Sequence, residues 1–129
     1  MYEQSYQFSF EAAHELGANI KMSDSPDGEA HPYSRIHGHS FVATVTLGAA
    51  NLSGGKWIVD YAELKRDCQK VASRLDHRLL NEIEGLSTPT LECLARWIFD
   101  AVRQSQPALT TVEVARPTLG EKVRYSAGE

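Results

Sequence analysis

Three histidines, at positions 14, 37 and 39, have the residue type and the spacing of metal ligands. On a β-strand, residues two apart point to the same side, so His37 and His39 would present their imidazoles together, about 7 Å apart at the backbone. His14 ends a separate strand-like segment and supplies a third nitrogen if the two strands pair. Three neutral imidazoles suit zinc, and three protein ligands leave one coordination position for water or substrate, which is typical of catalytic sites. If His37 and His39 stood alone, two strand histidines without a metal would be the simpler interpretation. The prediction of a metal site therefore depends on His14.

Two strands must position these ligands, and the hydrophobic pattern predicts both. Polar and apolar residues alternate from Tyr6 to His14, and again from His37 to Leu47, which is strand periodicity. Residues 17–34 between them are rich in Gly, Ser, Asp and Pro and predict a long loop, which in a small domain is usually functional. Asn51 to Lys56 predicts a turn into a third strand, Trp57 to Val59.

The apolar spacing then becomes helical. One helix is predicted from Tyr61 to Leu75 with Asp60 as its N-cap, and a second from Leu91 to Val102 with Thr90 as its N-cap. Polar and apolar residues alternate again at 112–116 and 122–125, which predicts two further strands. This order is satisfied by an α+β domain in which an antiparallel sheet carries two helices on one face.

Bulk properties exclude several classes of protein. A chain of 129 residues forms one domain, 1–129, and its 42% hydrophobic and 23% charged residues are those of a globular protein rather than a disordered one. The net charge of −4 argues against a nucleic-acid partner. Neither a membrane-spanning run nor a leader after Met1 is apparent, so a cytoplasmic protein without a membrane partner is expected. Cys68 and Cys93 are too few for a disulfide framework, and Cys68 reads as a buried thiol.

Several longer motifs resemble one known family, the 6-pyruvoyltetrahydropterin synthase and 6-carboxytetrahydropterin synthase group. The matching segments, in chain order, are FSFEAAH (8–14), IHGHSF (36–41), GKWIVDYAEL (55–64), LDHRLLN (75–81) and PTLE (89–92). The resemblance implies the tunnelling fold, an α+β domain with a four-stranded antiparallel sheet and two helices on one face. It also implies a homohexamer, a dimer of trimers with active sites between subunits.

The same resemblance implies a reaction. The substrate would be 7,8-dihydroneopterin triphosphate, a small molecule, and zinc on His14, His37 and His39 would act as a Lewis acid on its side-chain oxygens. The 6-carboxytetrahydropterin branch cleaves that side chain, releases acetaldehyde and serves queuosine-type deazapurine synthesis. Asp76 and His77 match the family's catalytic pair, in which histidine transfers a proton and aspartate orients it. Adjacent residues on a helix do not face each other, so this pair requires the helix to end or distort there.

Two positions depart from the family pattern. Four residues before His37 the family usually has a cysteine that acts as base, and this chain has Tyr33. A tyrosine, with a pKa of about 10, is a poor base unless the zinc lowers that pKa. Tyr33 therefore stands as a candidate catalytic residue, a binding residue or a spectator, and His31 and Glu29 are alternative bases.

The second departure is in the late strand. The family's pterin-anchoring glutamate falls at Arg116, which cannot accept hydrogen bonds. Glu113 or Glu121 could substitute, so the substrate-binding candidates are Thr90, Arg116 and Glu121. Arg35, Lys56 and Lys21 are the candidate residues for binding the triphosphate of the substrate.

Three functions follow from the sequence. The first is a zinc-dependent lyase that makes 6-carboxy-5,6,7,8-tetrahydropterin. The second is a divergent relative acting on another pterin or a purine-like compound, or a 6-pyruvoyltetrahydropterin synthase. The third is a zinc-containing binding protein without turnover, which is supported only by the absence of the usual cysteine.

Overall fold

The computed structural model describes residues 1–17 and 34–128. Two long strands come first along the chain, and each of the two α-helices is then followed by one or two strands. The elements are β1 (Tyr2–His14), β2 (His37–Ala49), α1 (Tyr61–Ser73), β3 (Arg78–Leu79), α2 (Leu91–Arg103), β4 (Leu109–Arg116) and β5 (Glu121–Ser126), with 3-10 turns at Leu80–Glu82 and Pro117–Leu119. Within these residues the strands form one five-stranded sheet in the order β3-β1-β2-β4-β5.

The two longest strands form the centre of the sheet and carry the histidines. β1 and β2 pair antiparallel over their whole length, from Tyr2 opposite Ala49 to His14 opposite His37. Every second residue is buried from Phe8 to His14 in β1 and from Phe41 to Leu47 in β2, and the rings of Phe10 and Phe41 stack with centroids 5.1 Å apart. The predicted alternation is therefore confirmed, and His14 is the last of the buried residues of β1.

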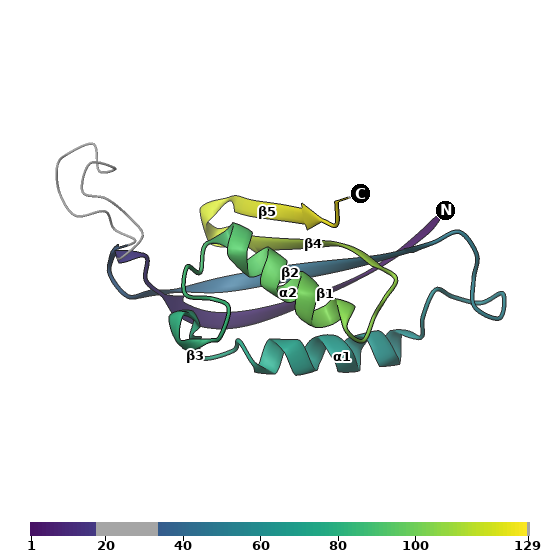
Figure 1. Ribbon diagram of the computed structural model, residues 1–129, viewed down its shortest axis with the longest axis horizontal. Coiled ribbons are helices and arrows are strands. Elements are labelled where there is room, and N and C mark those ends of the chain that lie inside the picture. The colour runs from purple at the N-terminus through teal and green to yellow at the C-terminus, as the bar shows by residue number, and fades with distance from the viewer. Residues whose placement is uncertain (18–33, 129) are drawn as a thin grey trace.

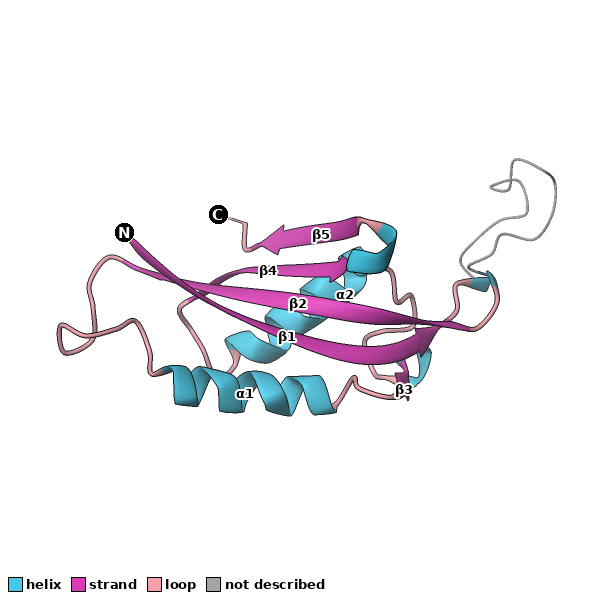
Figure 2. Ribbon diagram, turned by 180° about the vertical axis from the view of Figure 1, so that it is seen from behind, coloured by secondary structure: helices cyan, strands magenta, loops and turns pink. Residues whose placement is uncertain are grey.

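Both helices cover the same face of the sheet, as predicted (Figures 1 and 2). Each begins where expected, because Asp60 accepts a hydrogen bond from the Ala62 N–H and Thr90 accepts one from the Cys93 N–H. The apolar stripes of α1 and α2, with Leu64 and Leu94 fully buried, complete the core. The opposite face of the sheet is left exposed along β1, so its two faces have different environments.

The predicted third strand at Trp57 to Val59 is wrong. The structure has only a single bridge there, Ser53 to Trp57, around a turn with left-handed glycines at Gly54 and Gly55. The physical reason lies in Gln4, whose side-chain amide bonds both the N–H and the C=O of Val59, at 3.1 and 2.9 Å. A side chain thus takes the place of a strand partner and ends the pairing.

The sheet also gains an edge strand that the pattern did not predict, so it has five strands instead of four. β3 is only two residues long and pairs parallel to the end of β1, with Ala12 opposite Arg78. Asn81 fixes this edge, because its side-chain amide bonds both the N–H and the C=O of Glu15 at 2.9 and 2.8 Å. The edge strand brings Asp76 and His77, just before it, against β1.

No helix in the described part of the chain is long and apolar enough to cross a membrane. Cys68 is buried, as predicted, and burial raises the pKa of its thiol to about 12, with the neighbouring Asp67 charge adding to the effect. Cys93 is exposed on α2.

Candidate active site

The three predicted ligands come together at one end of the β1–β2 pair. Candidate ligand atoms of His14, His37 and His39 all lie within 4.8 Å of one another. The strand register explains this geometry: His14 is directly opposite His37, and His39 is two residues further along the same face. His14 is fully buried and the other two are half-buried. The structure therefore confirms the predicted clustering of the three imidazoles.

Backbone carbonyls fix which nitrogen each of two rings presents. The Nδ1 atom of His14 lies 2.8 Å from the carbonyl oxygen of Pro89, and that of His37 lies 2.7 Å from the carbonyl oxygen of Arg35. A carbonyl only accepts, so both Nδ1 atoms carry the hydrogen and both Nε2 atoms carry a lone pair when the rings are neutral. These two Nε2 atoms are 2.9 Å apart. Two lone pairs at that separation repel each other, and a cation bound by both removes the repulsion.

The surroundings also favour the neutral form of two of the imidazoles, those of His39 and His14. Burial lowers the pKa of His39 to about 4, and the positive charge of Arg116 and the other two histidines contribute. Burial likewise lowers the pKa of His14, against the opposing effect of its bond to Pro89. Metal ions bind neutral imidazole, so these two ligands would release no proton on binding a metal at neutral pH.

The donor set fits zinc. Zinc–nitrogen bonds of about 2.0–2.1 Å in a tetrahedral site place ligand nitrogens about 3.3 Å apart, close to the 2.9 Å found between His14 and His37. The carbonyls of Pro89 and Arg35 accept hydrogen bonds from the Nδ1–H groups of His14 and His37, and zinc-binding histidines are commonly oriented by such bonds. With three protein ligands, a tetrahedral metal keeps one position for a substrate oxygen or water.

Asp76 and His77 form the predicted pair just after α1. The helix ends at Ser73, and the backbone at His77 has a positive φ of 57°, which turns the two adjacent side chains toward each other. The His77 Nδ1 atom lies 2.9 Å from the Asp76 Oδ2 atom, so Asp76 accepts the Nδ1–H and, in the neutral ring, the lone pair is on Nε2. The N–H of Glu11 and the bond to His77 lower the pKa of Asp76, which therefore stays ionised.

The pair faces an open pocket of about 520 Å³ over the end of β1. Its walls include Glu11, Gly38, Ser40 and His77. Glu11 and Ser40 are opposite each other on the exposed face of the sheet, whereas the histidine rings belong to the helix-covered face. His39 lines the pocket as well as belonging to the cluster.

The remaining predicted site residues are placed as follows. Arg116 is buried at the end of β4, and its Nε atom lies 2.9 Å from a carboxylate oxygen of Glu121, opposite it on β5. Arg116 follows Val114 on the buried face of β4, and Val114 is opposite the buried Ala43, so Arg116 and Glu121 lie on the histidine side of the sheet. The positive charge of Arg116 contributes to the lowered pKa of His39 and of His14. The Thr90 hydroxyl caps α2, one residue from the carbonyl that orients His14.

Other candidates lie outside the site or outside the described residues. Lys56 lies over the Trp57 ring, in the loop that follows the far end of β2. Glu113 forms an ion pair with Lys122 on the open face, with 3.8 Å between the carboxylate oxygen Oε1 and Nζ. Tyr33, His31, Glu29 and Lys21 fall outside the described residues.

Sequence reasoning missed Glu11, Ser40 and the two orienting carbonyls. Glu11 and Ser40 lie inside the motifs that carry the histidines, but on the alternate positions, which a ligand search passes over. A carbonyl has no sequence signal of its own, so Pro89 and Arg35 could be recognised only from the structure.

Known proteins of one family resemble this chain over nearly its whole length. The family model of 6-pyruvoyl tetrahydropterin synthase matches residues 3–127. The 6-carboxy-5,6,7,8-tetrahydropterin synthase of Synechocystis sp. is 36% identical over 125 residues, covering 92% of this chain and 88% of that protein. The dihydroneopterin monophosphate aldolase of Pyrococcus furiosus is 31% identical over 116 residues, covering 90% and 86%.

A solved structure supports the fold. The 6-pyruvoyl tetrahydropterin synthase of Caenorhabditis elegans superposes with a TM-score of 0.80 at 23% identity, covering 98% of this chain and 96% of that one. Together with the sequence matches, this makes the predicted tunnelling fold and family assignment correct. The chain belongs to the 6-pyruvoyl tetrahydropterin synthase family, whose members are pterin-processing lyases.

Proposed function

We propose that this protein is a zinc-dependent lyase that converts 7,8-dihydroneopterin triphosphate to 6-carboxy-5,6,7,8-tetrahydropterin. One observation carries the zinc site: two histidine Nε2 atoms with fixed lone pairs lie 2.9 Å apart in a three-histidine cluster. The choice of product is supported by the 36% identity to the synthase of that name. When bound, zinc would supply Lewis-acid polarisation of the substrate's side-chain oxygens.

The chain's own residues have separate roles in this proposal. His14, His37 and His39 hold the metal, and the carbonyls of Pro89 and Arg35 keep two of those rings in the ligating tautomer. His77 moves a proton at Nε2 while Asp76 holds its Nδ1–H. Tyr33, Thr90, Arg116 and Glu121 remain candidates for contacts with the substrate.

A homohexamer would complete the site. The pocket beside His77 lies over the open face of the sheet, and the histidine rings lie on the covered face. An assembly that places the Asp76–His77 pair of one subunit beside the metal ligands of another unites the two groups. Such an enzyme would serve queuosine or related deazapurine synthesis.

Product analysis tests this function. Purified protein supplied with zinc is incubated with 7,8-dihydroneopterin triphosphate, and the products are separated by chromatography and mass spectrometry. We expect 6-carboxytetrahydropterin, acetaldehyde and inorganic triphosphate, all three lost in His77→Gln. Metal-loaded protein that consumes no substrate would refute the proposal and favour a binding protein.

A second function is a related carbon–carbon cleavage of a different pterin, or of a purine-like compound. Two observations favour it: Arg116 and Tyr33 replace the family's usual anchor and base, and the 31% identical relative is named an aldolase acting on dihydroneopterin monophosphate. Supplying the monophosphate in the same assay separates the two functions. Faster turnover of the monophosphate, with a glycolaldehyde-type fragment in place of acetaldehyde, supports the second.

A further inference from the structure

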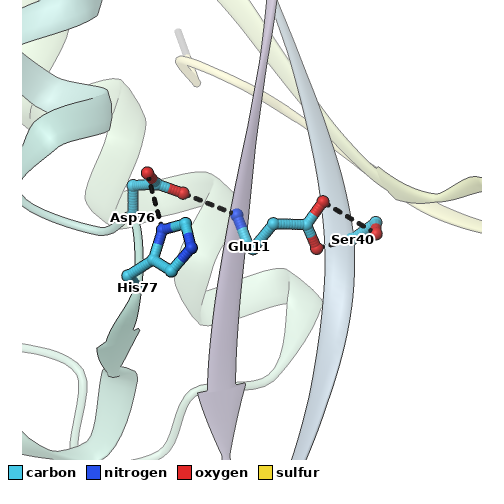
Figure 3. A network of polar contacts seen from close by, with 4 residues as sticks. All are labelled: Glu11, Ser40, Asp76 and His77. Carbon is cyan, nitrogen blue, oxygen red and sulfur yellow. Dashed lines mark hydrogen bonds and ion pairs between the residues drawn. The ribbon is translucent and has the colours of Figure 1, made fainter.

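Glu11 holds the Asp76–His77 pair through its main chain (Figure 3). Its N–H donates to Asp76 Oδ1 at 2.8 Å, and its carbonyl accepts from the His77 N–H at 2.6 Å. Asp76 therefore bonds Glu11 with one oxygen and the His77 ring with the other. The position of the imidazole is fixed relative to residue 11 of β1.

The side chain of Glu11 extends from the other side of β1, toward β2 (Figure 3). The Ser40 hydroxyl lies 2.9 and 2.7 Å from its two carboxylate oxygens, so one O–H is shared between them. No other side chain in the described ranges 1–17 and 34–128 is within hydrogen-bond or ion-pair distance of this carboxylate. An ionised carboxylate has about four acceptor positions, and the Ser40 hydroxyl brings a single hydrogen to them.

Glu11 and His77 line the same pocket of about 520 Å³. Gly38, which also lines it, has an ordinary backbone, and a Cβ built there would meet only the Ala12 carbonyl oxygen, at 3.6 Å. The backbone does not require glycine at this position. Because Gly38 lines the pocket, a side chain at this position would take up part of its space, and glycine leaves that space open.

We propose that Glu11 is a substrate-contacting residue whose carboxylate accepts a hydrogen bond from a hydroxyl group of the pterin's polyol side chain. An ionised carboxylate can only accept, so the group that it selects must be a donor. The pocket places this acceptor on one side of the ligand and the His77 imidazole on the other. The hydroxyl would thus be fixed beside the atoms between which His77 moves a proton. This inference rests on the proposed function, because it takes the ligand to be a pterin.

Binding of two non-reacting ligands tests it. Neopterin carries a trihydroxypropyl side chain and 6-methylpterin carries none, and both are fluorescent, so their dissociation constants can be measured by titration. The quantity of interest is the ratio of the two constants, in the parent protein, Glu11→Gln and Glu113→Gln. Glu113 is the matched control, because it is another carboxylate of the open face but does not line this pocket.

We expect the parent to bind neopterin more tightly than 6-methylpterin. In Glu11→Gln the ratio of the two dissociation constants should fall about tenfold, which is the difference between a charge-assisted and a neutral hydrogen bond. Glu11→Ala, which removes the acceptor, should abolish the preference, whereas Glu113→Gln should keep it. All variants should melt at the parent's temperature, since the main-chain bonds of residue 11 remain.

The outcomes separate the two proposals. If the parent binds neopterin and the ratio of the two dissociation constants in Glu11→Gln stays within twofold of the parent's, the role of Glu11 is overturned. The proposed pterin function would still stand. A parent that binds the two ligands equally also overturns it. A parent that binds neither pterin refutes the proposed function, and the role of Glu11 with it.

Discussion

Acidification should destabilise the metal-free protein through His39. Burial lowers the pKa of this histidine from 6.5 to about 4 in the folded chain. The unfolded chain therefore takes up a proton at a pH where the folded chain does not. The contribution of His39 to the free energy of unfolding is fully present above pH 6.5. It is lost as the pH falls from 6.5 toward 4, because protonation favours the unfolded state.

The size of the effect follows from the shift. Each pKa unit corresponds to about 1.4 kcal/mol, so the shift sets an upper bound of roughly 3 kcal/mol. His39 is half-buried, and solvent screening reduces the expected loss to between about 1 and 3 kcal/mol. The change is a large part of a typical unfolding free energy of about 5–15 kcal/mol.

Urea denaturation between pH 7 and pH 4 measures this loss. The parent and His39→Gln are compared after chelation, at one protein concentration, so that assembly contributes equally at each pH. The parent should lose more unfolding free energy than the variant over this interval. Asp76 does not confuse the comparison, because its pKa is lowered from 3.8 and its contribution is lost only below that pH. Identical pH slopes in the two proteins would refute the proposed burial of a neutral His39.

Three further predictions follow from the structure. Asp76→Asn should reduce kcat by at least about tenfold with unchanged metal content, because the amide cannot hold the ionic bond to His77; equal kcat would contradict the role of the pair. Thr90→Ala should cost about 1 kcal/mol in urea denaturation, by removing the cap of α2; an unchanged midpoint would contradict it. In the native protein a thiol reagent should modify Cys93 and spare Cys68, whose thiol pKa is raised to about 12 by burial; two reactive thiols per chain would contradict the fold.

Much of the site could be predicted because its residues repeat with the period of a strand. His37 and His39 share a face for the same reason that Phe41 and Val45 do, and Phe8 and Phe10 lead to His14 in the same way. The helices were equally predictable from their apolar stripes and from the caps Asp60 and Thr90.

What could not be predicted depends on contacts between residues distant in the sequence. The Gln4 side chain replaces a strand partner for Val59, 55 residues away, and so removes the predicted third strand. The short strand β3 follows from the fit of the 75–81 turn against β1, which no local pattern encodes. The Asp76–His77 pair itself was predicted only by resemblance, since its contact requires the positive φ at His77.

The metal dependence of turnover tests the central claim most directly. Acetaldehyde released from 7,8-dihydroneopterin triphosphate is measured for the protein as purified, after chelation, and after reloading with zinc. We predict one acetaldehyde per pterin consumed, lost on chelation and restored by zinc in the parent, but not restored in His37→Ala. Turnover that survives removal of the metal, or that zinc restores equally in His37→Ala, would contradict a catalytic zinc on the three histidines.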